Sequence, residues 1–210
     1  MRLEAFTGPP FDENAYLLAD AAGEAAIVDP GDGAAALLAR ARALGLRVCR
    51  ILLTHAHLDH ISNVDLVKRT FDVPIYLHAA DQPLYDAIVE QGRYFGIPMR
   101  QQPPVDHRLI DGMTLDVGAL SVRVHETPGH SPGGVVFEIR DPGGRVTILS
   151  GDTLFAGSIG RTDLPGGDYQ TLIDSIQRVL LAFPDDVAVH PGHYGPTTIG
   201  AERSGNPFLQ

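Results

Sequence analysis

The chain has 210 residues, and its 44% hydrophobic and 20% charged residues are typical of a globular protein. Asp and Glu outnumber Lys and Arg by 26 to 16, and the formal charge of −10 disfavours nucleic acid as a partner. No apolar run reaches the roughly 20 residues of a membrane span, and the N-terminus does not resemble a signal peptide, so a cytoplasmic protein without membrane contact is expected. The length fits one domain over residues 1–210.

Short apolar runs alternate with helical patterns in the first half of the chain, which predicts an α/β fold. Strands are expected over residues 14–18, 25–28, 50–54 and 73–77. Helices are expected over residues 34–44, 62–71 and 81–91. The run Asp29-Pro30-Gly31-Asp32 is typical of a tight turn and is interpreted as structural. Residues 92–106 contain three prolines and two glycines without periodicity, which predicts a loop or lid.

The second half of the chain is richer in strands. They are expected over residues 115–117, 121–125, 135–139, 146–149 and 187–189. One helix is expected over residues 172–183, where apolar side chains recur at helical spacing before Pro184. The residues after the last strand are interpreted as a polar, glycine-rich tail.

Polar clusters directly follow four of the expected strands. They occupy residues 54–60, 127–130, 151–152 and 191–193 and contain five of the nine histidines. In layered α/β folds the loops at the carboxyl ends of strands converge on ligands. Imidazole and carboxylate donors suit zinc, iron or manganese, and the single cysteine excludes a cysteine-rich structural site. The sequence therefore predicts a metal site built from these loops.

The spacing within residues 54–60 favours two ions over one. Asp59 and His60 are adjacent, so they point in directions different from those of His55 and His57. A first ion would then be held by His55, His57 and His130. A second ion would be held by Asp59, His60 and His193, and Asp152 would bridge the two and leave a position open for water.

The motif His55-Ala56-His57-Leu58-Asp59-His60, followed by His130, Asp152 and His193, resembles the metallo-β-lactamase superfamily. The resemblance covers essentially the whole chain and implies an αββα sandwich, in which helices flank two mixed β-sheets and the metals lie at one edge of the sheets. Three later runs, at residues 151–155, 160–168 and 206–209, resemble the short glyoxalase II-like branch. Hydrolases of that branch bridge their metals with an aspartate, which would be Asp152 here.

The resemblance implies a hydrolase with two divalent ions, zinc first and iron or manganese as alternatives. Its substrate would be a small-molecule thioester of the acyl-glutathione type, attacked by a metal-bound hydroxide, with Asp59 and Asp152 as catalytic residues. A thiol has a pKa near 8.5 and leaves without a dedicated general acid. Arg161 follows a strand that carries a ligand, and it is interpreted either as a substrate contact or as a surface partner of Asp163.

Three other functions agree with the same motif residues. A persulfide dioxygenase resembles the pattern and would hold a single iron with the residues that match His55, His130 and Asp152. A lactonase is a further enzymatic alternative, and a non-catalytic metal-binding interaction module is the alternative outside enzymes. The sequence also leaves a homo-oligomer open.

Overall fold

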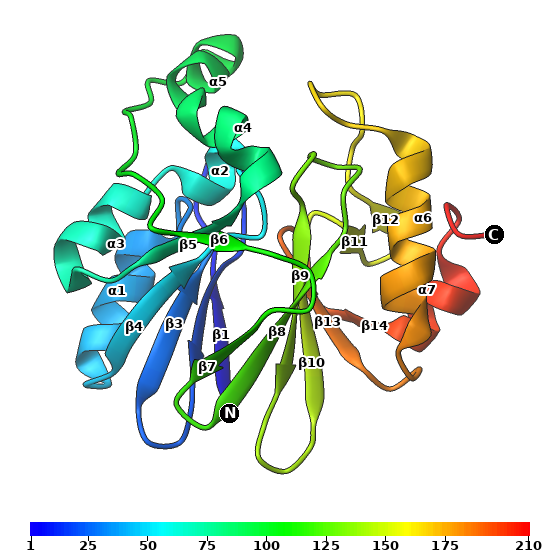
Figure 1. Cartoon of the computed structure of the whole chain (residues 1–210), viewed down its shortest axis with the longest axis horizontal. Coiled ribbons are helices and arrows are strands. Elements are labelled where there is room, and N and C mark those ends of the chain that lie inside the picture. Colours follow the sequence, from blue (N-terminus) through cyan, green and yellow to red (C-terminus); the bar gives the residue numbers. More distant parts are fainter.

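The computed structural model describes residues 1–210 and contains two six-stranded β-sheets that pack face to face, with helices on their outer faces (Figure 1). This arrangement confirms the αββα sandwich expected from the sequence. None of the helices is long and apolar enough to cross a membrane.

The first sheet combines antiparallel and parallel strands. In sheet order, its strands are β1 (Arg2–Phe6), β2 (Ala15–Ala19), β3 (Glu24–Val28), β4 (Arg47–Leu52), β5 (Ile75–His78) and β6 (His107–Leu109). The strands from β3 to β6 are parallel, so their carboxyl ends lie at the same edge. Every residue of β2 is buried because both faces of the sheet are covered, which explains its continuous apolar sequence.

The second sheet is mostly antiparallel. In sheet order, its strands are β14 (Thr197–Thr198), β13 (Ala188–Pro191), β10 (Val146–Gly151), β9 (Val135–Arg140), β8 (Leu120–Glu126) and β7 (Thr114–Val117). Only β10 and β13 pair in parallel. The strands β11 (Leu154–Phe155) and β12 (Ser158–Ile159) form a small hairpin beside this sheet.

Helices cover both outer faces of the sandwich (Figure 1). On the side of the first sheet lie α1 (Ala34–Ala43), α2 (Leu58–Ile61), α3 (Val64–Phe71), α4 (Gln82–Asp86), α5 (Ile88–Phe95) and the 3-10 turn η1 (Ala79–Asp81). On the side of the second sheet lie α6 (Tyr169–Val179), the 3-10 turn η2 (Leu180–Ala182) and α7 (Ile199–Gly205). The carboxylate of Asp168 caps α6 by accepting a hydrogen bond from the Thr171 amide at 2.8 Å.

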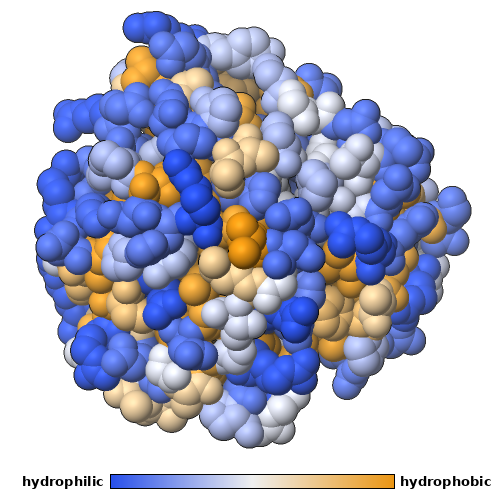
Figure 2. Space-filling model, viewed as in Figure 1, coloured by the Kyte–Doolittle hydropathy of each residue, from blue (hydrophilic) through white to orange (hydrophobic).

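The hydrophobic core has three layers. The middle layer lies between the sheets and includes Leu18, Val28 and Phe137. A second layer fills the space between the first sheet and its helices, and a third lies between the second sheet and α6. Because these layers cover both faces of the sheets, the loops at the site edge are anchored in well-packed strands. On the face shown in Figure 2, hydrophobic residues are interspersed with hydrophilic ones.

Several elements differ from the sequence predictions at their ends. The helix α5 continues to Phe95, so the loop expected from residue 92 begins only after that residue. Gly92 lies inside this helix, where a side chain would approach the Ile97 carbonyl oxygen to 2.4 Å. The expected polar tail instead forms β14 and α7, and the Thr198 hydroxyl caps that helix. The strands β1 and β6 were not predicted, because both lie at sheet edges and carry few buried side chains.

Candidate metal centre

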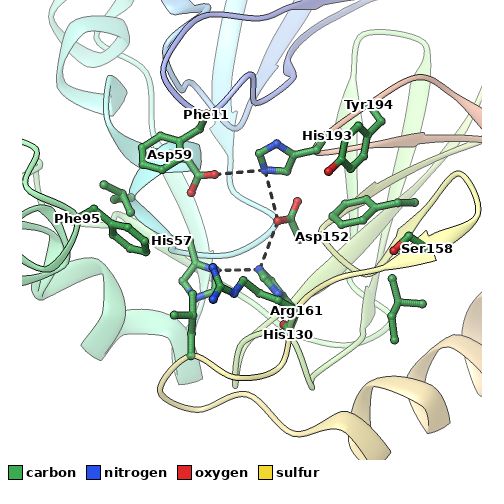
Figure 3. Close-up of a pocket in the computed structure, with 14 residues that line it drawn as sticks. Phe11, His57, Asp59, Phe95, His130, Asp152, Ser158, Arg161, His193 and Tyr194 are labelled. Carbon is green, nitrogen blue, oxygen red and sulfur yellow. Dashed lines mark hydrogen bonds and ion pairs between the residues drawn. The ribbon is translucent and has the colours of Figure 1, made fainter. Parts of the chain in front are cut away.

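The four polar clusters of the sequence lie together at one edge of the sandwich (Figure 3). They follow the carboxyl ends of β4, β8, β10 and β13, strands that belong to both sheets. The glycine before His193 is required by this crowding, because a side chain at Gly192 would lie 2.3 Å from Asp152 Oδ1 and 2.6 Å from His60 Cε1.

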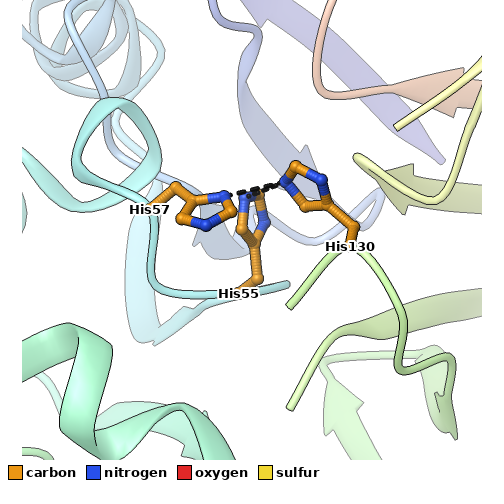
Figure 4. Close-up of side chains that lie close together, drawn as sticks. All are labelled: His55, His57 and His130. Carbon is orange, nitrogen blue, oxygen red and sulfur yellow. Dashed lines mark hydrogen bonds between the residues drawn. The ribbon is translucent and has the colours of Figure 1, made fainter. Parts of the chain in front are cut away.

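Three imidazoles, those of His55, His57 and His130, form what we call the first cluster (Figure 4). The Nδ1 atom of His57 lies 2.8 Å from Nε2 of His130, and Nε2 of His55 lies 3.2 Å from the same atom. All three side chains are buried. Three ring nitrogens that converge in this way form a set of donors for one cation.

Asp59, His60 and His193 form the second cluster, whose ligand atoms lie within 4.8 Å of one another. The Nε2 atom of His193 lies 3.2 Å from Oδ2 of Asp59, and Nε2 of His60 lies 3.9 Å from the same oxygen. This cluster mixes nitrogen and oxygen donors, whereas the first has nitrogen alone.

The carboxylate of Asp152 lies between the two clusters (Figure 3). Its Oδ2 atom is 3.4 Å from Nε2 of His130 and 3.5 Å from Nε2 of His193. Its Oδ1 atom is 3.3 Å from Nε2 of His60. One carboxylate can therefore contact cations in both clusters.

The two clusters have opposite electrostatics. Burial and the neighbouring imidazoles hold the pKa of His55 well below its usual value, and burial with His130 lowers the pKa of His57 to about 3. Burial alone would also lower the pKa of His60, but the carboxylates of Asp152 and Asp59 raise it well above its usual value. His55 and His57 thus offer neutral imidazoles at pH 7, whereas the second cluster attracts positive charge.

These residues fit a divalent transition metal. Nε2 of His60 and Oδ1 of Asp152 are buried 3.3 Å apart, but neither makes a hydrogen bond within the protein. Buried polar atoms without a hydrogen bond are rare in folded proteins, and a cation would satisfy both. The Nδ1–H of His130 donates to the Arg161 carbonyl oxygen at 2.7 Å, which leaves Nε2 free to bind a metal.

Asp29 lies against the second cluster, next to His60. Its Oδ1 accepts a hydrogen bond from the Thr54 amide at 2.7 Å, and its Oδ2 accepts one from the Thr54 hydroxyl at 2.6 Å. The same Oδ2 lies 3.1 Å from Nδ1 of His60. The interpretation of residues 29–32 as a purely structural turn was therefore incomplete, because the turn also orients a side chain of the site.

Asp81 supports the first cluster and was not identified from the sequence. Its Oδ2 accepts hydrogen bonds from the Ala56 amide at 2.9 Å and the Ser131 hydroxyl at 2.8 Å, and its Oδ1 accepts one from the Gly133 amide at 2.6 Å. It thereby ties the loop of His57 to the loop of His130. Nothing in the local sequence marks this role, since the partners lie 25 to 52 residues away.

Gln91 of α5 also binds the loop that carries His57. Its Nε2 donates to the Ala56 carbonyl oxygen at 2.9 Å, and its Oε1 accepts a hydrogen bond from the Leu58 amide at 3.0 Å. Both backbone groups next to His57 are thus fixed by one side chain, which limits the orientations available to this imidazole.

A cavity of about 400 Å³ opens beside the clusters. Its lining combines ligand candidates with hydrophobic side chains and consists of Phe11, His57, Leu58, Asp59, Phe95, His130, Asp152, Phe155, Ser158, Ile159, Arg161, Leu164, His193 and Tyr194. Arg161 lines this cavity and also forms two hydrogen bonds of 2.7 Å with Asp163. Both interpretations of Arg161 therefore describe part of its environment.

The remaining four histidines lie outside the two clusters, and each has another partner. His78 contacts Glu126 at 2.9 Å, and His125 contacts Glu138 at 2.9 Å. His107 packs on Tyr76, and His190 packs edge-on against Tyr16.

Paired clusters of histidine and aspartate at the edge of an αββα sandwich define a metal-binding protein of the metallo-hydrolase class. The family model of the metallo-beta-lactamase superfamily matches residues 8–193, and the chain belongs to that superfamily. The family suggested by the sequence motif is thus confirmed.

Similar proteins extend over nearly the whole chain. The hydroxyacylglutathione hydrolase GloC of Haemophilus influenzae is 38% identical and aligns with 100% of this chain and 98% of its own. The crystal structure of the B3 metallo-beta-lactamase BLEG-1 is 40% identical, with a TM-score of 0.91 and full coverage of both chains. The protein TTHA1623, solved in a di-iron-bound form, is 44% identical, with a TM-score of 0.86, and covers 98% of this chain and 100% of its own.

Proposed function

We propose that the protein hydrolyses thioesters of the acyl-glutathione type with two divalent metal ions, zinc foremost. The first cluster would hold one ion and the second cluster the other, with Asp152 contacting both. The observation that carries the proposal is the position of the Asp152 carboxylate, which lies 3.3 to 3.5 Å from histidine nitrogens of both clusters. The similarity to GloC, a hydroxyacylglutathione hydrolase, supports this substrate class.

Bound divalent metals lower the pKa of a coordinated water toward neutrality and polarise a carbonyl oxygen. The chain supplies the remaining requirements. Neutral His55 and His57 keep lone pairs available at pH 7, because their pKa values are lowered. Asp59 and Asp152 face the cavity, where they can orient the attacking water by accepting its hydrogen bonds.

The requirements of the leaving group limit the kinds of bond that the protein can hydrolyse. Apart from the ligand candidates, the lining of the cavity contains no carboxyl or imidazole group that could protonate an amine or alkoxide leaving group. A thiolate needs little such help, since free thiols have a pKa of about 8.5. This favours a thioester over an amide as the substrate.

The decisive experiment is metal analysis of protein purified without chelators, combined with a thioester hydrolysis assay. We expect about two metal ions per chain and hydrolysis of an acyl-glutathione. A single iron, with oxygen consumed when glutathione persulfide is added and thioesters left intact, would instead identify a dioxygenase. Hydrolysis of a lactone but no thioester would identify a lactonase, and tightly held metal without any activity would identify a binding module.

A further inference from the structure

Aromatic side chains form two opposing walls of the cavity (Figure 3). Phe11 and Phe95 form what we call the Phe95 wall, with ring centroids 5.9 Å apart and planes at 86°. Phe155 and Tyr194 form the Tyr194 wall, with centroids 5.7 Å apart and planes at 79°. Asp59 and Asp152 lie between the walls in Figure 3, so a group held there would be close to both clusters.

The walls are assembled by the fold and not by one local motif. Phe11 lies in the loop between β1 and β2, Phe95 ends α5, Phe155 belongs to β11, and Tyr194 follows β13. Tyr194 is 73% exposed and has a φ of 66°, a conformation that residues other than glycine rarely adopt. Asn14 holds it by donating from Nδ2 to the Tyr194 carbonyl oxygen at 2.9 Å. A large exposed aromatic held in this way is available to a ligand.

The polar groups of the cavity are few once the ligand candidates are set aside. The lining then offers only the Ser158 hydroxyl and the Arg161 guanidinium besides the Tyr194 phenol. Arg161 is already paired through two nitrogens with Asp163. A substrate group that carries free carboxylates would therefore find one cation with its charge partly offset, and the formal charge of −10 on the chain adds no attraction.

The size of the cavity also limits what it can enclose. A volume of about 400 Å³ lies near the lower end of the roughly 300 to 1,000 Å³ typical of small-molecule sites. An acyl group with an aromatic ring and the thioester itself fit this space. Because the lining offers few polar groups besides the ligand candidates, the acyl group should contribute more to selectivity than the polar thiol.

Building on the proposed hydrolysis, we infer that the two walls bind an apolar acyl group. The protein accordingly prefers arylacyl or alkylacyl thioesters to thioesters of small polar acids. Contact with Phe95 and Phe11 on one side and Tyr194 on the other removes apolar surface of the substrate from water, which a hydroxylated two- or three-carbon acyl group cannot match.

The test compares phenylacetyl-glutathione with lactoyl-glutathione, which share the thiol and differ in the acyl group. We expect kcat/KM for the phenylacetyl compound to be higher by about tenfold or more, the factor of one well-filled apolar contact. Phe95→Ala should lower kcat/KM for the phenylacetyl substrate about tenfold and for the lactoyl substrate less than about twofold. Phe208→Ala is the matched control, because Phe208 is similarly exposed, at 43% against 36%, and lies outside the cavity lining; it should change neither value.

A binding measurement separates recognition from turnover. S-phenethyl-glutathione, an uncleavable thioether, should bind wild-type protein about tenfold more tightly than S-methyl-glutathione, and Phe95→Ala should remove that difference. Equal hydrolysis of both thioesters, or equal loss of both in Phe95→Ala, would overturn the inference and leave the proposed function standing. Hydrolysis of no thioester by metal-loaded protein would overturn the proposed function and this inference with it.

Discussion

The two ligand clusters share one edge of the sandwich but differ in the charged groups that they contain. In the first cluster His55 and His57 stay neutral, and Asp81 supports the cluster through hydrogen bonds to backbone and hydroxyl groups. The second contains a carboxylate, and Asp29 lies directly against its His60. The first cluster contains no carboxylate of its own, whereas the second needs a metal ion or protons to balance its acidic groups.

Glu13 extends the acidic surroundings of the second cluster. Both of its carboxyl oxygens are buried without a hydrogen bond, and Oε1 lies 3.9 Å from Nδ1 of His60. Burial raises the pKa of Glu13 well above its usual value, and His60 only partly opposes this. One edge of the sandwich therefore carries a site defined by the geometry of its donor atoms and a site defined by its charged groups.

The largest expected effect is that of metal removal, which strips both clusters. Prolonged chelation should abolish thioester hydrolysis, because the nucleophile depends on a bound metal. Added zinc or manganese should restore it, as followed by activity against metal content. Undiminished activity in a verified metal-free sample would contradict the proposal for both clusters.

Loss of the residue between the clusters should be almost as severe. Asp152→Ala should reduce kcat by about 10³-fold, equivalent to roughly 4 kcal/mol of activation free energy, because both ions lose a ligand. His107→Ala and His78→Ala serve as controls and should change kcat by less than about threefold, since their side chains contact Tyr76 and Glu126 instead. Similar losses in all three variants would speak against a bridging role.

A substitution confined to the second cluster tests whether the two sites are separate. Asp59→Ala should lower the metal content from about two ions toward one and reduce kcat roughly 10²-fold, because only one set of ligands is broken. Elemental analysis of the variant measures this directly. Asp174→Ala, which removes an exposed carboxylate on α6, is the matched control. Unchanged stoichiometry in Asp59→Ala would assign Asp59 a role outside the ligand set.

The contrast between ligand candidates and their supports also shows what the sequence can reveal. His55, His57, Asp59 and His60 are close in sequence and follow a predictable strand, so their pattern was recognisable. Asp81 was not, because its three partners lie in two distant loops. The larger strands and helices were likewise predictable from periodicity.

The elements and residues that were missed depend on tertiary contacts. The sequence of the helix α7 is polar, and only Ile199 and Glu202 of this helix are buried. The aromatic walls combine side chains from four separate segments, so no local pattern could group Phe11 with Phe95. Their convergence requires the three-dimensional arrangement of both sheets.

The supporting aspartates should act on different ions. Asp81→Asn should weaken binding of the first ion about 10- to 100-fold, because Asp81 links the loops of His57 and His130. Asp29→Asn should weaken the second ion by a similar factor through His60. Competition with a chromophoric chelator measures both affinities, and thermal unfolding checks that each variant is folded. Weakening of the same ion by both variants would show that the clusters are not independently supported.

The smallest expected effect concerns Arg161, which lies outside both clusters. Arg161→Ala should raise KM for phenylacetyl-glutathione up to about fivefold, since an exposed ion pair contributes at most about 1 kcal/mol. KM for the neutral phenylacetyl thioester of N-acetylcysteamine should change less than twofold, because no carboxylate is lost from contact.

Asp163→Ala provides the converse test for Arg161: it frees the guanidinium and should lower KM for the glutathione substrate alone. The Arg161 carbonyl that accepts from His130 remains in Arg161→Ala, so metal content should stay at the wild-type value. Equal changes for both substrates would place Arg161 on the surface with Asp163 and outside the binding site.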